Sequence, residues 1–503
     1  MKIKRYIALI MTLVMAASLP VCASNQTTSS EIVTEETTEQ SKSEDATTEE
    51  TTEQPKSEEA TTEQEEYSEV TTEETTEQPK TENPTEQITR NPDLAYTGLS
   101  PADSKVLVID PGHCKIHPGA SGNGLKEEVV VLDISLAMYE ALKDYADITV
   151  YLTREDGGCC RNLGVGNDCL YARSNYAQQL DANFLVSIHI NAGHTNGANA
   201  LVAYKSGYHD NIRKETQAFG KLALKELYAI GVKNRGFLLR KSGSGSRYSN
   251  GKLCDYYAIV RRGVVDEIPG VIMEHGYITN ASDCKKFFKT KAQRKKVGEA
   301  DAKAMIAYYN LAKKTIAGSF IVENGETYYK NSIGQIVSGW VKSDGKWYYF
   351  DEMTGQMKKG MYSDGNNSFF LSPSTGEMVV GEFTLDGCKY MARGNGTLVK
   401  SAIHTDGVGT YLYDPAGKKL SKGFHTIDNN TYYVINSKKV ARGLTKIGSK
   451  YYGFDSKTGV MATGWKKIKG KYYYFDEDTG KMAKSKWIGN YYVNKKGVRT
   501  KKK

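Results

Sequence analysis

The hydrophobic pattern between residues 104 and 312 alternates short apolar runs with longer amphipathic segments. Three runs rich in branched apolar residues and bounded by turn formers predict buried strands at 106–109, 184–191 and 270–274. Segments with helical spacing predict helices at 133–145, 170–180, 211–230 and 290–311, with further strands at 149–153 and 199–204. Alternation of strand and helix predicts an α/β fold for this part of the chain.

A different pattern begins at residue 318, where Gly, Tyr, Lys and Asp replace the long apolar runs. In a period of about 20 residues, a Gly-Trp pair precedes an aromatic run and a Gly turn. The clearest copies begin at Gly339-Trp340 and Gly464-Trp465. Hairpins of this length bury their rings only by stacking on their neighbours, so the pattern predicts a β-hairpin repeat solenoid over 318–503.

The first 95 residues lack both patterns. Residues 1–23 have basic residues, an apolar run and then Val21-Cys22-Ala23, which is typical of a secretory signal peptide. A lipid anchor on Cys22 is the competing interpretation, although Pro20 and Val21 are unfavourable before a lipidated cysteine. No later run approaches the roughly 20 apolar residues of a membrane span. Residues 24–95 are rich in Thr and Glu and too poor in apolar residues to fold, which predicts a disordered acidic spacer.

Charge is distributed unevenly along the chain, whose formal net charge is +8. Residues 24–95 contain 21 acidic and 4 basic side chains, and residues 1–23 contain three basic ones. The part that follows therefore has 60 basic and 38 acidic side chains, an excess of about 22 positive charges. Such a surplus indicates an anionic partner. The export signal argues against nucleic acid and favours anionic cell-wall polymers or glycans.

Candidate catalytic residues lie where the predicted strands end. His113 follows the first strand across Asp110-Pro111-Gly112, His189 lies near the end of the second, and Glu274 ends the third. Glu127 closes the loop after the first strand. Ligands of open α/β sheets bind at the carboxyl ends of the strands. Two imidazoles and a carboxylate, with a second carboxylate as general base, match the composition of a catalytic zinc site.

Four motifs in this order carry a family resemblance. They are DPGH (110–113), GNGLKEE (122–128), SIHIN (187–191) and MEHGYITN (273–280). Together they resemble the zinc-dependent N-acetylmuramoyl-L-alanine amidases of bacterial cell walls, over roughly residues 104–312. The resemblance implies a three-layer α/β/α fold with a mostly parallel twisted sheet and one catalytic zinc ion. It also implies cleavage of the amide bond between the lactyl group of N-acetylmuramic acid and L-alanine in peptidoglycan.

The resemblance assigns roles to individual residues. It makes His113, Glu127 and His189 the zinc ligands and Glu274 the catalytic carboxylate. Glu127 is preferred to its neighbour because Leu132 fills the apolar helix position that follows the family's glutamate by five residues; Glu128 is expected to be solvated in the first helical turn. Asn191, on the same strand face as His189, is expected to contact substrate. Of Tyr256 and Tyr257, Tyr257 is chosen as a substrate contact, and a core position is the alternative for either tyrosine.

His275, Arg173 and the cysteines are expected to have structural and not catalytic roles. His275 alternates with Glu274 and should point to the opposite face of the strand. Arg173 is expected to form a structural ion pair. Cys114 has no convincing catalytic partners, and the eight cysteines contain no Cys-x-x-Cys pair, which argues against a cysteine zinc site. A disulfide from Cys159 or Cys160 to Cys169 is possible, but the connectivity stays open.

The repeats resemble the choline-binding type of cell-wall-binding repeat, in which aromatic cages hold quaternary ammonium groups by cation–π contacts. Several Gly-Trp pairs have other residues in the Trp position, so choline, another wall polymer and a glycan all remain alternatives. The chain as a whole is therefore predicted to be an exported, cell-wall-associated amidase of a Gram-positive-type bacterium. Another zinc peptidase of peptidoglycan, a catalytically inactive wall-binding protein and a toxin-like binder of host glycans are the alternatives.

Overall fold

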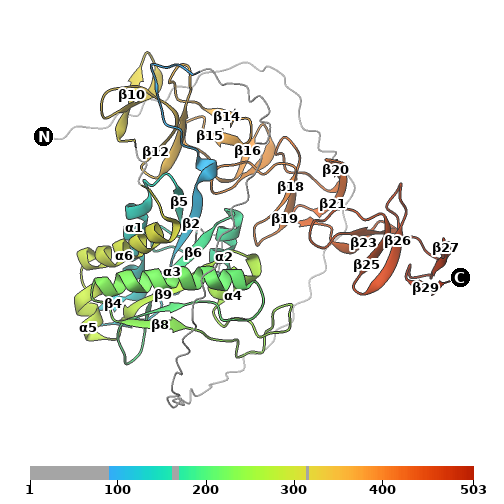
Figure 1. Cartoon of the computed structure of the whole chain (residues 1–503), viewed down its shortest axis with the longest axis horizontal. Helices are drawn as coiled ribbons and strands as arrows, with labels where there is room; N and C mark the ends of the chain where they lie inside the picture. Colours follow the sequence, from blue (N-terminus) through green and yellow to red (C-terminus); the bar gives the residue numbers. More distant parts are fainter. Residues whose placement is uncertain (1–89, 161–168, 313–315, 503) are drawn as a thin grey trace, which may run out of the picture. The chain divides into compact units, whose positions relative to one another are not determined.

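The computed structural model describes residues 90–160, 169–312 and 316–502 (Figure 1). The predicted signal peptide and the predicted spacer up to residue 89 lie outside these ranges. The last spacer residues, 90–95, are ordered, contrary to prediction. Ala95 in β1 (Ala95–Tyr96) pairs with Val337 of β12 (Val337–Ser343), and the Asn91 N–H donates to the Glu352 carbonyl over 3.0 Å. The prediction of disorder rested on side-chain composition, whereas these contacts are made by backbone groups.

A six-stranded sheet forms the centre of the α/β domain, in the order β5-β2-β6-β9-β7-β8. The first four strands in this order are parallel, β7 is antiparallel to β9, and β8 is parallel to β7. The strands are β2 (Lys105–Pro111), β5 (Ile148–Leu152), β6 (Phe184–Asn191), β7 (Ala198–Leu201), β8 (Asn234–Leu238) and β9 (Gly270–Tyr277). The predicted mostly parallel sheet is confirmed.

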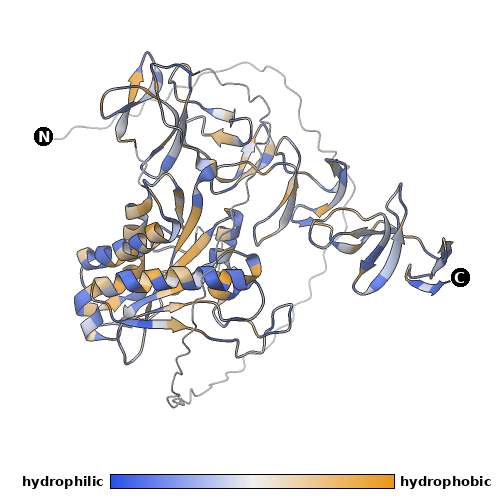
Figure 2. Cartoon of the chain, in the orientation of Figure 1, coloured by the Kyte–Doolittle hydropathy of each residue, from blue (hydrophilic) through white to orange (hydrophobic). Residues whose placement is uncertain are grey.

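Helices cover both faces of this sheet, which makes the three layers. One face packs against α1 (Glu127–Leu142), α3 (Asp210–Ala229) and α6 (Lys291–Tyr309), and the other against α2 (Cys169–Gln179) and α4 (Ala258–Asp266). Alternation along β2 sends Leu107 to the first core and Val108 to the second. Figure 2 shows apolar colour along β2 and β6 and mixed colour on α3, as expected for buried strands and an amphipathic helix.

Some boundaries differ from the predicted ones. Helix α1 begins at Glu127, six residues before the predicted start, because Val130 and Val131 are buried in the core despite their β-branched side chains. Strand β9 continues past Glu274 to Tyr277. The pattern did not predict β8 or α4. Short elements complete the domain: a 3-10 turn (Pro101–Asp103), β3 (Ser121–Gly122), β4 (Leu125–Lys126), α5 (Ala281–Asp283) and a π-helical turn (Cys284–Phe288).

The C-terminal region is a series of antiparallel hairpins, as predicted. The strands after β12 are β13 (Lys346–Phe350), β14 (Gly360–Ser363), β15 (Ser368–Leu371), β16 (Gly381–Leu385), β17 (Cys388–Ala392), β18 (Ala402–Thr405), β19 (Thr410–Tyr413), β20 (Gly423–Ile427), β21 (Asn430–Asn436), β22 (Lys439–Val440), β23 (Gly443–Ile447), β24 (Lys450–Phe454), β25 (Gly464–Ile468), β26 (Lys471–Phe475), β27 (Lys486–Ile488), β28 (Tyr491–Val493) and β29 (Arg499–Lys502). The first hairpin is β10 (Gly318–Glu323) with β11 (Glu326–Asn331).

Among the described residues, no helix is both long and apolar enough to cross a bilayer.

Methionines from one repeat pack beneath glycines of the next. A Cβ atom on Gly376 would lie 2.6 Å from Met357 Sδ, and one on Gly480 would lie 2.6 Å from Met461 Sδ. Both glycines have a positive φ, +74° at Gly376 and +65° at Gly480. Successive hairpins therefore stack so closely that the turn positions have no room for a side chain.

Candidate active site

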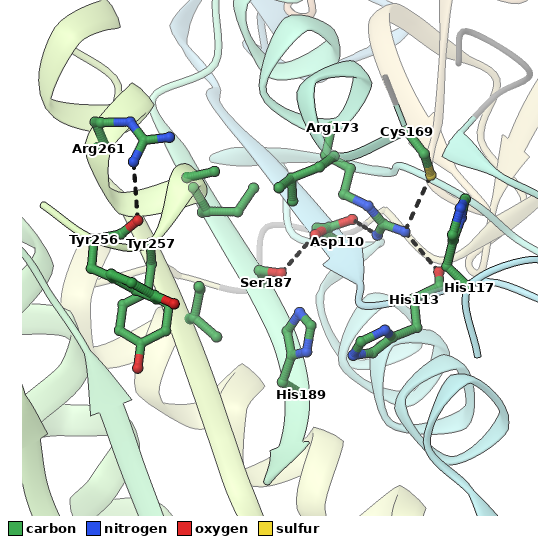
Figure 3. Close-up of a pocket in the computed structure, with 14 residues that line it drawn as sticks. Asp110, His113, His117, Cys169, Arg173, Ser187, His189, Tyr256, Tyr257 and Arg261 are labelled. Carbon is green, nitrogen blue, oxygen red and sulfur yellow. Dashed lines mark hydrogen bonds and ion pairs between the residues drawn. The ribbon is translucent and has the colours of Figure 1, made fainter. Parts of the chain in front are cut away.

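A buried ion pair fixes the loop that carries His113. Asp110, at the end of β2, accepts hydrogen bonds from Thr153 Oγ1 and Ser187 Oγ, each over 2.6 Å, and pairs with the Arg173 guanidinium (Figure 3). Burial alone would raise the pKa of Asp110, but Arg173 and the two hydroxyls hold it below its usual range. Arg173 also donates to the His113 carbonyl over 2.7 Å. The predicted structural role of Arg173 is confirmed.

Three of the predicted residues meet beside this loop. His113 Nε2 lies 3.1 Å from Glu127 Oε1, and His189 Nδ1 lies 3.2 Å from the same oxygen. The two imidazole rings are 4.8 Å apart and inclined by 75°. One potential ligand atom from each residue lies within 4.8 Å of the others. The fold therefore brings together two imidazoles and a carboxylate from three separate segments.

The backbone holds Glu127 in place. Its Oε1 accepts the Ile190 N–H over 3.1 Å, and its Oε2 accepts the Ala120 N–H over 2.9 Å. Burial opposes ionisation, but the hydrogen bonds to His113 and His189 keep the pKa of Glu127 well below its usual range. An ionised carboxylate is thus fixed between the two rings.

The donor set fits a zinc ion. Burial lowers the pKa of His189 despite the neighbouring Glu127, which favours the neutral imidazole that metals require. One carboxylate and two imidazoles leave a fourth position for water or substrate, as catalytic zinc sites do. The ionised carboxylate and the neutral imidazole are the forms that bind zinc, and the potential ligand atoms of His113, Glu127 and His189 already lie close together.

Glu128 does not have the solvated position that was expected. It is only 7% exposed, and its Oε2 lacks a hydrogen-bond partner within the described residues. Its N–H donates to the Pro118 carbonyl, and its own carbonyl accepts a bond from Arg154 over 2.8 Å. The prediction failed because the loop before α1 and the Arg154 side chain cover this first helical turn.

Two glycines permit the close approach of the three ligands, a feature missed in the sequence. A Cβ on Gly112 would lie 2.5 Å from His189 Nε2, and one on Gly119 would lie 2.5 Å from Glu127 Oε2. Gly119 also has φ of +70°. The glycines that flank His113 in the chain were the available signal, because glycine is the usual residue where backbone approaches a functional group.

Glu274 lies next to His189 on the neighbouring strand. The two are paired in the parallel register of β6 and β9, so their side chains share the α2 and α4 face of the sheet. Glu274 Oε2 has no hydrogen-bond partner in the part of the chain described. Burial, with a contribution from the charge of Glu127, raises the pKa of Glu274 to about 8. A buried carboxyl that readily exchanges a proton therefore lies beside the three ligands.

His275 points to the opposite face, as alternation predicts. Its Nδ1 lies 3.1 Å from the His189 carbonyl and its Nε2 lies 2.8 Å from Asp301 Oδ2 in α6. Burial lowers and Asp301 raises the pKa of His275, with a net increase. This residue links the backbone of the His189 strand to the helix layer behind the sheet.

A cavity of about 570 Å³ opens next to the ligands. Its walls include His113, His189, Tyr256 and Tyr257, with the tyrosines facing the histidines across the space in Figure 3. Tyr257, which was predicted to contact substrate, lies in the wall of this cavity. Asn191 is not among the residues that line this cavity in the described structure; its Oδ1 accepts the Ala192 N–H over 2.8 Å.

An aromatic cage between the last two repeats contains a cation of the chain itself. The Arg499 guanidinium carbon lies 4.1 Å from the ring centre of Tyr472, 4.6 Å from that of Tyr491 and 5.7 Å from that of Trp465. Three rings around one cation form the type of site that binds quaternary ammonium groups. Here arginine occupies that position.

Comparisons with known proteins find relatives of both the α/β domain and the hairpin repeats. Residues 107–307 match the family described as N-acetylmuramoyl-L-alanine amidase, and 317–362, 337–383 and 441–487 match the choline-binding repeat. A sporulation-specific N-acetylmuramoyl-L-alanine amidase of Bacillus subtilis (strain 168) is 25% identical over 46% of this chain and 79% of that protein. The amidase LytC of the same strain is 28% identical over 42% of this chain and 36% of LytC.

Among solved structures, the catalytic domain of CwlV, an N-acetylmuramoyl-L-alanine amidase from Bacillus (Paenibacillus) polymyxa var. colistinus, is 25% identical. The match covers 41% of this chain and 99% of that chain, with a TM-score of 0.31. The family matches confirm the predicted family and enzyme class. The chain therefore combines a catalytic domain of the N-acetylmuramoyl-L-alanine amidase family with C-terminal choline-binding repeats.

Proposed function

We propose that this protein is a zinc-dependent hydrolase of the amide bond between the lactyl group of N-acetylmuramic acid and L-alanine in peptidoglycan. The observation that carries the proposal is the convergence of His113, Glu127 and His189 beside Glu274, at the carboxyl edge of the parallel strands. Ligand sites of open α/β sheets occur at this edge. The amidase family match over this domain supports the choice of bond.

His113, Glu127 and His189 would hold the zinc ion. Bound zinc would polarise the lactyl carbonyl, favour the ionised form of nearby Glu274 and lower the pKa of water from about 15.7 toward 7. Arg173 and the backbone amides that hold Glu127 keep the ligands in place without reorganisation. A preorganised site of this kind avoids rearrangement during the reaction.

Glu274 acts as the proton carrier in this proposal. Its carboxylate accepts a proton from the attacking water, and the resulting carboxyl group donates it to the leaving alanine nitrogen. Burial disfavours the charged form of Glu274, which favours the protonated carboxyl that donates in the second role. Tyr257, in the wall of the cavity, and Asn191, at the end of β6, are proposed to contact the glycan or stem peptide.

The repeats are proposed to place the enzyme on its polymeric substrate. Their family match and the basic surplus of the chain support binding to anionic cell-wall polymers or glycans. Together with the predicted signal peptide, this supports an exported protein associated with the wall of a Gram-positive-type bacterium.

The test compares the wild-type full chain with Glu274→Gln on purified peptidoglycan. We expect both proteins to bind zinc at the catalytic site. We expect the variant to release stem peptides with a free L-alanine amino terminus roughly 100- to 10,000-fold more slowly. Glu267→Gln, on the surface at the end of α4, is the control and should keep full activity. Cleavage between two amino acids of the stem peptide would instead identify a peptidase, and loss of zinc in Glu274→Gln would make this residue a ligand.

A further inference from the structure

A second group of potential metal-binding side chains lies close to the His113 loop. Cys114 Sγ is 3.3 Å from Cys159 Sγ and 3.6 Å from His117 Nδ1. With Cys169, these residues place three sulfurs and one imidazole nitrogen within 4.8 Å of one another. No residue of this group belongs to the predicted catalytic set.

Three separate segments supply the four side chains. Cys114 and His117 lie in one tight turn, where each backbone N–H donates to the other's carbonyl over 3.0 Å. The Lys115 N–H donates to the Gly157 carbonyl over 2.9 Å, which joins this turn to the loop that carries Cys159. Cys169 begins α2. The backbone thus directs both ends of a Cys-x-x-His turn toward the two other cysteines.

We propose that Cys114, His117, Cys159 and Cys169 bind a structural zinc ion, separate from the catalytic site. Three thiolates and one imidazole are a common ligand set for structural zinc, which is tetrahedral. With zinc–sulfur bonds of about 2.3 Å, tetrahedral ligands lie about 3.8 Å apart. The observed separations, from 3.3 Å to at most 4.8 Å, need only small side-chain movements to reach this arrangement.

Burial agrees with a closed structural site that still has an entry path. Cys114 and Cys169 are buried, Cys159 is half-buried and His117 is exposed. An ion can therefore reach the sulfurs from the His117 side. The expectation of no cysteine zinc site relied on the missing Cys-x-x-Cys pair, whereas the fold supplies a Cys-x-x-His turn and two distant cysteines.

Arg173, which pairs with Asp110, links the proposed site to the catalytic loop. Arg173 Nη2 lies 3.9 Å from Cys169 Sγ, and the same nitrogen donates to the His113 carbonyl over 2.7 Å. His117 and Cys169 also line the cavity that His113 lines. A metal here would tie together the three segments that carry its ligands, two of which line the cavity.

The decisive comparison is the zinc content of the purified, fully reduced full chain and its variants. We expect two zinc ions per wild-type chain, one in Cys169→Ser and one in His189→Ala. Cys254→Ser, which removes a buried cysteine outside the group, should keep both. Two zinc ions in Cys169→Ser, or one in the wild type that is lost only in His189→Ala, would overturn the proposal.

Cobalt substitution identifies the ligands without relying on activity. Co²⁺ bound by thiolates has an intense sulfur-to-metal charge-transfer absorption, which a site of two histidines and a glutamate lacks. We expect this band in wild type and in His189→Ala, and its loss in Cys169→Ser. Retention of the band in His189→Ala would support the cysteine site even if the catalytic proposal failed.

A disulfide is the competing fate of the two closest sulfurs. Digestion of the protein as isolated, without reductant, should give Cys114 and Cys159 in separate peptides whose thiols react with iodoacetamide only after zinc is chelated. A linked Cys114–Cys159 peptide in the zinc-replete protein would overturn the proposal. This measurement needs no variant, so it remains decisive if a cysteine substitution impairs folding.

Discussion

At the scale of single residues, Glu127 shows how position separates two adjacent and chemically identical side chains. Its oxygens accept the backbone N–H groups of Ile190 and Ala120, and one of them also contacts both histidines. Glu128, one residue later, turns away by the angular step of the helix and is buried beneath the preceding loop. Of these two carboxylates, Glu127 is therefore the one that contacts both histidines of the proposed zinc site.

This difference predicts opposite results for two matched substitutions. Glu127→Gln replaces the charged ligand with an amide and should weaken zinc binding at the catalytic site at least ~10-fold. Glu128→Gln should leave that affinity within about twofold. Competition with a chromophoric chelator measures both. Equal losses in the two variants would contradict the assignment of Glu127.

At the scale of elements, the ion pair of Asp110 with Arg173 joins the end of β2 to α2. Both side chains are almost fully buried, so each charge depends on the other. The pair also fixes the backbone of His113. This connection positions the His113 loop, and both side chains also line part of the cavity.

Asp110→Asn should lower the free energy of unfolding by about 3–5 kcal/mol, because it leaves the Arg173 charge buried without its partner. Glu299→Gln is the control, since it breaks the exposed pair with Lys295 in α6 and should cost less than about 1 kcal/mol. Urea denaturation of each variant gives both values. A small loss for Asp110→Asn would mean that solvent reaches Arg173.

The cage between the last two hairpins carries another prediction at this scale. Arg499 lies over the rings of Tyr472, Tyr491 and Trp465, so an external cation would have to displace it to bind there. Arg499→Ala should therefore tighten choline binding roughly 2- to 30-fold, the range expected for cation–π contacts. Choline titration followed by tryptophan fluorescence measures the change. Lys495→Ala, at an exposed position of the same hairpin, should bind choline like the wild type; weaker binding by Arg499→Ala would show that arginine maintains the cage.

At the scale of the whole molecule, the hairpin β12–β13 packs against the α/β domain. Trp347 Nε1 donates to Thr149 Oγ1 over 3.1 Å, and Trp347 and Trp340 share an apolar cluster with Ala146. Lys342 donates to the carbonyl of Tyr145 over 2.8 Å and to that of Ile148. The catalytic domain and this repeat thus share a buried interface.

Lys342 gives this interface a pH dependence. Burial lowers the pKa of Lys342 to about 7, with partial opposition from Asp144, whereas an unfolded chain has a lysine pKa of about 10.4. Between these values the unfolded state binds more protons, so stability rises with pH; the penalty is fully present below pH 7. The free energy of unfolding should therefore increase more between pH 7 and pH 10 in the wild type than in Lys342→Met.

Chemical denaturation at several pH values measures this difference. Lys450→Met, at an exposed hairpin position, is the control and should keep the wild-type slope. If Lys342→Met also keeps that slope, the Lys342 ammonium is stabilised in its charged form by the carbonyls of Tyr145 and Ile148.

Four motifs carried the family resemblance and, through it, the choice of Glu127. The sequence by itself also determined the alternation of strands and helices, apart from β8 and α4, and the strand-end positions of residues that meet in the candidate active site. It did so because periods of about 2 and 3.6 residues are local properties, and because parallel strands bring their carboxyl ends to one edge. His113, His189 and Glu274 each lie close to such an end, so three local patterns sufficed to place them together.

Only the tertiary structure decided the features that depend on distant segments. The burial of Glu128, the need for Gly112 and Gly119, and the ordering of residues 90–95 all result from contacts with other parts of the chain. The cysteine group joins the segments after β2 and β5 with the start of α2. No local window of sequence contains these distances, because each depends on how the layers and hairpins pack together.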